Sequence, residues 1–444
     1  MSYAMRYISQ VYNERTGKVV AEETVYSKTL IYPQNIDELG LRHADQIDLL
    51  KASQDTFLKA QLEIIPVEII CPNCGRKTRK GGTHTSVFHD VFTDHEVKMK
   101  RFSCTCGWRN KYTVQGLYGS SSHPELVKLQ VERGAETSYI KASESLNNEC
   151  KTVRKINSDV NIMNKVTKVG SLLNNVKQAE KWVESPEKTL KLTLTTDGGH
   201  VQDKAEGKQS FEELISTAFK PEDLVAVTKN RNEIKNKICV GSAKSDKQVT
   251  IKQLTLNACK KLGMTTDTEI TALTDGANNC WSVVNSLTSY CESIITILDW
   301  FHIGKHFKSR ESKIPDLLKG KYNKAKWHLF HGHPKSGLVR LKQVKNEADD
   351  PATDEVIDWL INYIGNNTEH IVDYHNRKLK KLSYTSQLAE TSVNSVINSR
   401  QKNKKMRWTR EGAHNILQIR TSRYSETWDS DWCTVKNVMY KNAA

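Results

Sequence analysis

The chain has no apolar stretch long enough to cross a membrane. Such a span needs about 20 consecutive apolar residues, and polar or charged residues interrupt each apolar run of the 444-residue sequence before that length. The first twenty residues lack the apolar core of a secretory signal peptide. Internal repeats and low-complexity linkers are also missing. We therefore expect a soluble, cytoplasmic protein with no membrane partner and about two to four domains.

Acidic residues are too few to balance the basic ones. The sequence has 66 Lys and Arg against 51 Asp and Glu, a formal net charge of +15. An excess of this size favours a polyanionic partner, which is usually nucleic acid. On charge alone, a ribosome-associated or merely basic protein is the alternative.

Ten cysteines are present, and four of them form two close pairs in "CPNCG" and "CTCGW", about thirty residues apart. Two such pairs, each followed by glycine, are typical of a structural Zn²⁺ site with four ligands. The second pair is one residue shorter than usual, and two unrelated pairs of buried thiols are the alternative. The expected zinc ligands are Cys71, Cys74, Cys104 and Cys106. Histidines between the pairs that could replace a thiolate are His84, His89 and His95.

The first 185 residues divide into three segments. Residues 1–70 predict a β-hairpin followed by a helix, 71–118 form the zinc-binding module, and 119–185 are helical. The helical segment has the size of a helix-turn-helix DNA-binding region, although plain helical packing explains its pattern equally well. Its modest basic face consists of Lys151, Arg154, Lys155 and Lys165.

The secondary-structure pattern of the sequence changes from helical to strand-like near residue 186. Strand-like runs such as "KLTLTT" and "SIITILD", separated by helical segments, predict a mixed α/β sheet within 186–302. Residues 303–383 show no strand pattern, and 301–345 carry twelve Lys and Arg against two acids. Residues 384–424 predict two further helices, and the tail 425–444 has no clear pattern.

Three acidic residues are notable for their positions. Asp197 follows "LTLTT" and Asp275 follows "ITALT", and each precedes glycine, so we expect the backbone to turn directly after the carboxylate. Glu390 lies in the helical pattern "QLAETSVNSVI". Carboxylates at one rim of a sheet can bind two Mg²⁺ ions that assist phosphoryl transfer. Taken singly, each Asp-Gly pair is more often a simple turn.

The most apolar strand pattern, "SIITILDWFH", ends at Asp299 and places His302 three residues later. A carboxylate at the end of a buried strand is costly unless it binds a partner. Asp299 is therefore either a metal ligand or a residue that supports one. The structural alternative is an aspartate that caps the next helix beside a buried, hydrogen-bonded histidine.

Several of these segments together resemble the DDE transposases of bacterial insertion sequences, in particular the ISKra-type group related to Mutator-like transposases. The matching segments are "TTDGGHV", "LTDGANNCW", "LDWFH" and "AETSVNSVINSRQKNKKMRWTREGAHNILQIR", in the family's order over about residues 120–422. The resemblance implies an α/β, RNase H-like catalytic domain with an all-helical insertion at 303–383. The zinc-ribbon-like module and the helix-turn-helix-like region would precede that domain, as in the family's layout.

The resemblance also implies roles for individual residues. The catalytic residues would be Asp197 on the first strand, Asp275 on the fourth and Glu390 on a late helix, together holding two Mg²⁺ or Mn²⁺ ions. Glu355 and Glu369 are rivals for the third position. Asp299 and His302 match an acid, two residues, then histidine, and would form an auxiliary pair. Whether Asp275 or Asp299 is the second metal ligand stays open.

The implied activity is DNA transposition. A metal-activated water would cut at a transposon end, and the exposed 3′-OH would then attack target DNA at the same site. The partners would be terminal inverted repeats, target DNA and further copies of the chain, in a nucleoid-associated cytoplasmic protein. Trp408 would stack on a base or, equally well, pack beneath the basic helix. The expected DNA contacts are Arg400, Lys404, Lys405, Arg407 and Trp408.

Two alternatives belong to other classes. The chain could be an RNase H-like nuclease that cleaves DNA without joining it, although the zinc module and the insertion argue against a small nuclease. It could also be a domesticated transposase that only binds DNA, although the intact set of acids argues against lost catalysis.

Overall fold

The structure is a computed structural model that describes residues 3–65, 69–183, 187–205, 207, 209–228, 231–385, 392–403 and 406–440. It divides into two compact units. Unit 1 consists of residues 1–166 with 432–444, and unit 2 consists of residues 167–431. No helix in the described ranges is long and apolar enough to span a membrane.

Unit 1 begins with the predicted hairpin and helix. Strands β1 (Tyr3–Tyr12) and β2 (Val19–Leu30) pair antiparallel, and α1 (His43–Glu63) contacts β2. A second antiparallel hairpin, β3 (Arg79–His89) with β4 (Asp94–Ser103), carries the cysteine loops at its open end. The short helix α2 (Val114–Tyr118) packs against this hairpin, because Val114 forms a small apolar core with Val97 and Met99.

The helices that follow form the expected helical region. They are α3 (Pro124–Glu136), α4 (Tyr139–Cys150) and α5 (Asp159–Gln178), and the chain ends in α16 (Trp428–Tyr440). One residue of the expected basic face is buried, because the side chain of Arg154 is only 2% exposed. Its guanidinium forms an ion pair with Asp94 and donates hydrogen bonds to the carbonyls of Asp90, Val91 and Thr93. Arg154 therefore stabilises the β3–β4 turn and offers no charge to a DNA phosphate.

Unit 2 is built on a five-stranded mixed sheet in the order β11-β10-β5-β6-β9. Strand β6 is antiparallel to both β5 and β9, whereas β5, β10 and β11 are parallel to one another. A separate two-stranded ribbon joins β7 (Leu224–Thr228) to β8 (Arg231–Ile234). The strands of the main sheet are β5 (Thr189–Gln202), β6 (Ser210–Phe219), β9 (Ile238–Ser242), β10 (Met264–Thr274) and β11 (Ser293–Leu298).

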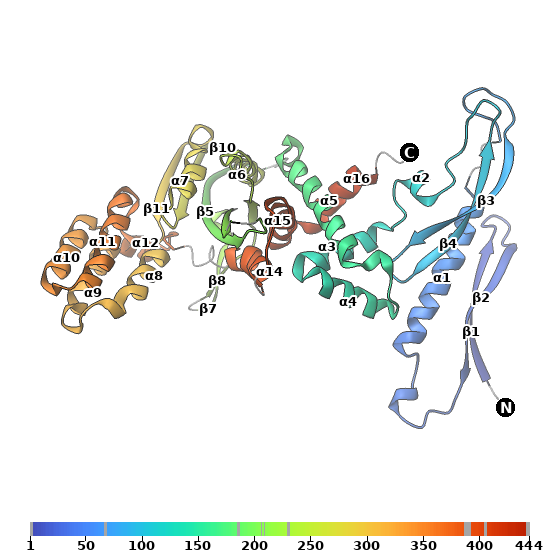
Figure 1. Ribbon diagram of the computed structural model, residues 1–444, viewed down its shortest axis with the longest axis horizontal. Helices are drawn as coiled ribbons and strands as arrows, with labels where there is room; N and C mark the ends of the chain where they lie inside the picture. Colours follow the sequence, from blue (N-terminus) through green and yellow to red (C-terminus); the bar gives the residue numbers. More distant parts are fainter. Residues whose placement is uncertain are drawn as a thin grey trace. The chain divides into compact units, whose positions relative to one another are not determined.

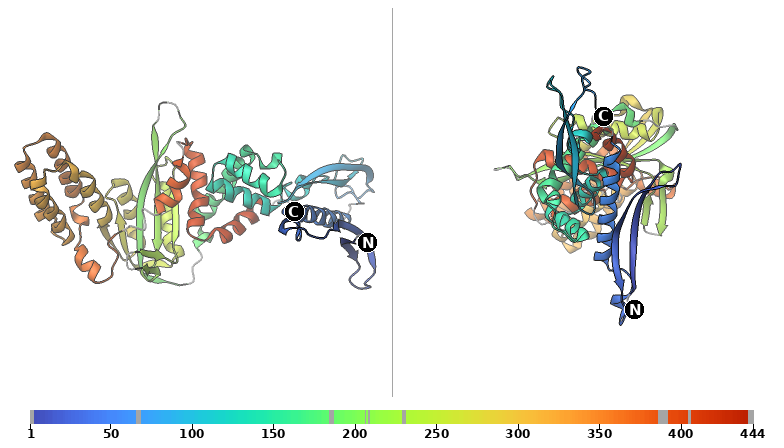
Figure 2. Two further views of the ribbon diagram at one scale, coloured as in Figure 1. Left: turned by 90° about the horizontal axis from the view of Figure 1, so that it is seen from below. Right: turned by 90° about the vertical axis from the view of Figure 1, so that its right-hand side faces the viewer.

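Helices cover both faces of this sheet (Figure 2). On one face, α6 (Val249–Lys261) and α7 (Asn278–Asn285) pack against alternating apolar residues such as Val240 and Leu194. On the other face lies α15 (Arg410–Tyr424), whose Leu417 leaves no room for a side chain at Gly241. The π-helical turn Asn394–Asn398 and α14 (Ser399–Gln401) lie on this second face as well.

The segment after β11 is helical, as the sequence predicts. It comprises α8 (Trp300–Arg310), α9 (Lys319–Phe330), α10 (Pro334–Ala348), α11 (Pro351–Asn366) and α12 (Tyr374–Leu379), with short 3-10 turns between them. These helices share an apolar core with the ends of β10 and β11, through Leu273, Ile297 and Leu298. Figure 1 shows α9, α10 and α11 (orange) side by side.

One predicted turn is wrong. The backbone does not turn after Asp197, because β5 continues through Gly198 and Gly199 to Gln202. These residues pair with β6, from Asp197 opposite Ile215 to Gln202 opposite Ser210. Glycine suits this stretch because a Cβ at Gly199 would lie 3.0 Å from Ile397, so the π-helical turn can approach the strand closely.

Candidate functional site

The candidate site begins where three neighbouring parallel strands reach the same level. Thr196 of β5 pairs with Thr274 of β10, and Thr274 pairs with Leu298 of β11. The next residue in each chain segment is an aspartate: Asp197, Asp275 and Asp299. Asp197 lies within β5, whereas Asp275 and Asp299 directly follow β10 and β11, and the register aligns the three at one level of the sheet. These three aspartates are called the acidic row.

The side chain of Asp197 is surrounded by groups that oppose its ionisation. Burial raises the pKa of this carboxyl from 3.8 to about 6, and the charges of Asp275 and Asp299 act in the same direction. The imidazole of His302 and the N–H of Gly198, which donates to Asp197 Oδ1 at 2.7 Å, partly oppose the rise in pKa. Asp197 is therefore electrostatically coupled to Asp275 and Asp299, and burial with these charges disfavours its ionised form.

Asp275 lies in a tight turn immediately after β10. Its Oδ1 accepts a hydrogen bond from the N–H of Ala277 at 2.9 Å, and its carbonyl accepts one from the Tyr363 hydroxyl at 2.8 Å. Gly276 has φ +94°, and a Cβ there would lie 2.8 Å from both Asn367 and Leu298. The predicted turn after this acid is therefore present, and both the backbone conformation and the lack of space require glycine at position 276.

Asp299 caps the next helix, as the structural alternative from the sequence states. Its side chain is fully buried, and Oδ1 caps α8 by accepting from the N–H of Phe301 at 3.0 Å. Its other oxygen lies 3.7 Å from Nε2 of His302, one turn into the helix. Asp299 is therefore a helix cap, and its charge also reaches Asp197.

One further acid near this level of the sheet, Glu212, had no signal in the sequence. Glu212 of β6 approaches the site from the other side of β5, with Oε1 2.8 Å from the position that a Cβ on Gly198 would take. Its Oε2 accepts a hydrogen bond from Asn279 Nδ2 at the start of α7. Only the antiparallel pairing of β6 with β5 brings Glu212 here.

Cys280 is the one thiol whose pKa responds to this group of acids in the described part of the chain. Burial raises its pKa well above the ordinary value, and the charges of Asp275, Asp197 and Glu212 raise it further. The thiol therefore stays protonated at neutral pH and is unsuited to act as a nucleophile.

The third expected acid, Glu390, lies outside the described residues. The first described residue after it, Ser392, lies 3.4 Å from Thr217 Oγ1, and Thr217 pairs with Thr195 of β5. Because residues alternate along a strand, Thr195 and Asp197 share a face. The rivals Glu355 and Glu369 are both exposed within the helical segment.

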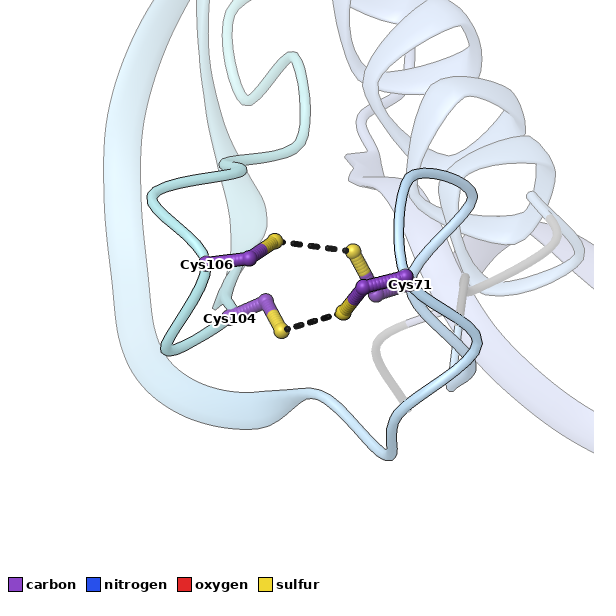
Figure 3. A group of neighbouring side chains, drawn as sticks. Cys71, Cys104 and Cys106 are labelled. Carbon is purple, nitrogen blue, oxygen red and sulfur yellow. Dashed lines mark hydrogen bonds between the residues drawn. The ribbon is translucent and has the colours of Figure 1, made fainter.

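The four cysteines of unit 1 come together as predicted, and they do so without a histidine. Cys71 Sγ lies 3.5 Å from Cys106 Sγ, and Cys74 Sγ lies 3.4 Å from Cys104 Sγ (Figure 3). Ligands of a tetrahedral Zn²⁺ with bonds of about 2.3 Å stand roughly 3.8 Å apart, so only small shifts are needed. Gly75 and Gly107 have φ of +68° and +93°, which lets each loop turn back on itself.

The thiols act on one another's ionisation in opposite directions. The backbone N–H of Arg76 lowers the pKa of the Cys74 thiol, but hydrogen bonds with the neighbouring thiols outweigh it and raise this pKa to about 12. The backbone N–H of Cys106 is the largest of the influences that lower the pKa of Cys104, which falls to about 6. His95 is engaged elsewhere, in hydrogen bonds to Asp90 and Asp55, and His89 contacts Asp94. The four-cysteine cluster could therefore hold a structural metal ion such as zinc.

A comparison with protein families gives one match. The model of "Uncharacterised protein family (UPF0236)" matches residues 120–436. The chain belongs to this family. A search of curated proteins found no match.

The UPF0236 match defines which features belong to the shared part of the chain. It contains Asp197, Asp275, Asp299, His302 and Glu390, together with the whole five-stranded sheet and the helical segment. It begins after the four cysteines, which lie between residues 71 and 106. The acidic row is therefore a feature of the family region, whereas the cysteine cluster lies outside the matched residues.

The residues of the UPF0236 chain that are expected to contact DNA lie in different environments. Trp408 is 8% exposed, and its indole N–H donates to the carbonyl of Gln401 at 3.0 Å. Arg400 is 2% exposed, with its guanidinium 4.9 Å from the centre of the Trp408 ring. Trp408 therefore packs inside the protein, as its structural alternative states, and Arg400 is buried against it. Arg407 is exposed, and Lys404 and Lys405 lie outside the described residues.

The carboxylates of the acidic row do not converge closely enough to form a complete metal site. Among the described residues, the ligand atoms of four cysteines lie within 4.8 Å of one another, but those of the aspartates do not form such a group. The aspartates therefore share an electrostatic environment without making a closed metal cage by themselves. A further ligand or a shift of side chains would be needed to close one.

Proposed function

We propose that this UPF0236 chain is a DDE-type DNA transposase. In this proposal it cuts the ends of a mobile DNA element and joins the exposed 3′-OH to target DNA by phosphoryl transfer. The observation that carries the proposal is the alignment of Asp197, within β5, with Asp275 and Asp299, which directly follow the parallel strands β10 and β11. Three acids at one edge supply the charge and the oxygen ligands that this chemistry requires.

The order and direction of the strands support an RNase H-like fold for the proposed catalytic domain. In chain order its strands are β5, β6, β9, β10 and β11, and the first lies centrally between an antiparallel second and a parallel fourth. An RNase H-like sheet shares this arrangement. Asp197 lies on the first strand and Asp275 follows the fourth, which are the positions that the resemblance to DDE transposases implies.

The acidic row suits divalent cations. Asp197 is hard to ionise because it is buried beside two other carboxylates, and a bound cation would remove this penalty. Asp197, Asp275 and Glu390 would hold the metal, with Asp299 and His302 beside them. When bound, Mg²⁺ would supply Lewis-acid stabilisation of the phosphoryl oxygens and a more acidic water.

Other residues of the chain would position the reacting groups. Asp299 fixes the start of α8, and this places His302 within the electrostatic reach of Asp197. The same helix carries exposed Lys305 and Lys308. These cations continue away from the acids along α8 and would contact the phosphates of a DNA strand whose scissile bond lies at the aspartates.

The decisive experiment measures strand joining. The purified chain is incubated with Mg²⁺, a plasmid target and a labelled duplex carrying the DNA that flanks its coding region. We expect nicking at a defined position, followed by covalent joining of the labelled 3′ end to the plasmid. Asp275→Asn and Glu390→Gln should abolish both steps while leaving DNA binding unchanged, and Glu369→Gln serves as the matched control because Glu369 is exposed.

Each other result contradicts the proposal in a different way. Nicking without joined product would identify an RNase H-like nuclease that does not transpose. DNA binding with neither step would identify a protein that only binds DNA. Loss of activity in Glu369→Gln, with Glu390→Gln still active, would show that the third acid is assigned to the wrong residue.

A further inference from the structure

We propose that His331, Asp373 and His375 form a second metal site, which binds a divalent transition ion such as Zn²⁺ on the helical segment of unit 2. The ligand atoms of these three residues all lie within 4.8 Å of one another. Two imidazoles and one carboxylate are a recurrent ligand set for Zn²⁺ and for other divalent transition ions, with a position left open for water. Neither the acidic row nor the cysteine cluster includes any of them.

The backbone brings the three residues together from segments that are distant in sequence. His331 ends α9, Asp373 caps α12, and the two form an antiparallel bridge. The turn after His331 passes close to Asp373, because Gly332 has φ +73° and a Cβ there would lie 3.1 Å from the Asp373 backbone. Both main chains are thus fixed before any ion binds, which limits the ordering cost of binding.

The side chains are oriented by separate contacts. The rings of His331 and His375 have centroids 4.8 Å apart, and both rings meet the Phe330 ring in edge-on geometry. Asp373 uses Oδ1 to accept the N–H of Asn376 at 2.9 Å, which orients its carboxylate at the start of α12. The carboxylate can therefore cap the helix through one oxygen and bind an ion through the other.

The surroundings favour a cation that enters from solvent. All three side chains are exposed. His331 lies at the carboxyl end of α9, where the partial negative charge of the last carbonyls attracts positive charge. A dication with two neutral imidazoles and one carboxylate would leave a net charge of +1 on a surface that is open to water or to an anionic ligand.

An ion at this position would hold together parts of the helical segment that adjoin the acidic row. Phe330 packs on Trp300 with ring centroids 4.8 Å apart, and the Tyr374 hydroxyl donates to the carbonyl of Leu298 at 2.7 Å. Trp300 and Leu298 flank Asp299 in the sequence. The proposed site therefore fixes the α9–α10 turn to α12 beside the residues that support Asp299.

The test counts metal ions. The full chain is stripped of metal, titrated with Zn²⁺ and analysed for bound zinc after gel filtration. We expect two equivalents for the unchanged chain and one for His375→Ala or Asp373→Asn. Asparagine at this position keeps the helix cap, because its side-chain oxygen also accepts the Asn376 N–H. His333→Ala is the matched control, since His333 is exposed in the same turn but lies outside the group, and it should keep both equivalents.

Cobalt distinguishes the two sites. Co²⁺ added to the chain loaded with one equivalent of Zn²⁺ should give ligand-field absorption without thiolate-to-metal charge transfer, because this site has no sulfur ligand. Asp373→Asn should lose that absorption. A single equivalent in the unchanged chain, or two in both Asp373→Asn and His375→Ala, would overturn the proposal. Loss of an equivalent in His333→Ala would also overturn the assignment of ligands.

Discussion

Replacing Asp197 with asparagine should stabilise the metal-free chain at neutral pH. Burial and neighbouring carboxylates raise the pKa of Asp197 from 3.8 to about 6, so the folded chain favours the protonated acid more than the unfolded chain does. A shift of about 2 pKa units corresponds to about 3 kcal/mol. The folded chain therefore loses stability as the pH rises from 3.8 to about 6, and the full loss persists above that pH range. The asparagine side chain carries no charge, and its oxygen can still accept the Gly198 N–H.

The assay compares urea unfolding at pH 4.5 and pH 7.5 in magnesium-free buffer. Hydrogen exchange read on peptides from β5 and β10 assigns the transition to unit 2. At pH 7.5 Asp197→Asn should exceed the unchanged chain in unfolding free energy by up to about 3 kcal/mol. At pH 4.5 the difference should be much smaller. Asp267→Asn, which replaces an exposed acid on the same sheet, should change neither value.

Magnesium provides the second half of this test. Mg²⁺ should raise the unfolding free energy of the unchanged chain at pH 7.5, because it binds the folded carboxylates and not the unfolded ones. It should have little effect on Asp197→Asn. The reasoning is refuted if the substitution destabilises unit 2 at pH 7.5, or if the gain is the same at both pH values.

Three further predictions concern other parts of the chain. Gly276→Ala should destabilise unit 2 by about 1–3 kcal/mol, because φ is +94° and the added Cβ meets Leu298 at 2.8 Å; an unchanged urea midpoint would contradict this. Arg154→Met should destabilise unit 1 by about 1–3 kcal/mol, because the carbonyls of Asp90, Val91 and Thr93 lose their donor, whereas Asp94 is 37% exposed and keeps His89. A loss under about 0.5 kcal/mol in urea titration would show that these hydrogen bonds are dispensable. Cys71→Ser should remove one equivalent of bound zinc and speed proteolysis of the β3–β4 hairpin, whereas unchanged zinc content would exclude Cys71 as a ligand.

The sequence predicted the local elements of the chain well. Alternating apolar residues marked β5, a strand-like run before Asp275 marked β10, and a nearly continuous apolar run marked β11. The absence of any strand pattern marked the helical segment from residue 303. The close spacing within the cysteine pairs predicted the cluster of unit 1, because each pair lies in one short loop. These properties depend on neighbours along the chain, and sequence patterns report them directly.

Burial of individual polar side chains was harder to predict. Arg154 and Arg400 look like surface cations in the sequence, but both are buried. Arg154 pairs with Asp94, sixty residues away, and Arg400 packs on the Trp408 ring. The continuation of β5 through two glycines was also missed, because it depends on pairing with β6 across the sheet. Asp-Gly-Gly by itself favours a turn, and the partner strand overrides that preference.

The sequence by itself determined that acids follow three strand-like runs, that two cysteine pairs form short loops, and that a basic helical segment follows β11. Only the tertiary structure decided that the three acids lie level with one another. That alignment depends on the pairing of Thr196 with Thr274 and of Thr274 with Leu298, over separations of 78 and 24 residues. The same holds for Glu212 and for His331 with Asp373, since strand order and helix packing bring together residues that no local pattern relates.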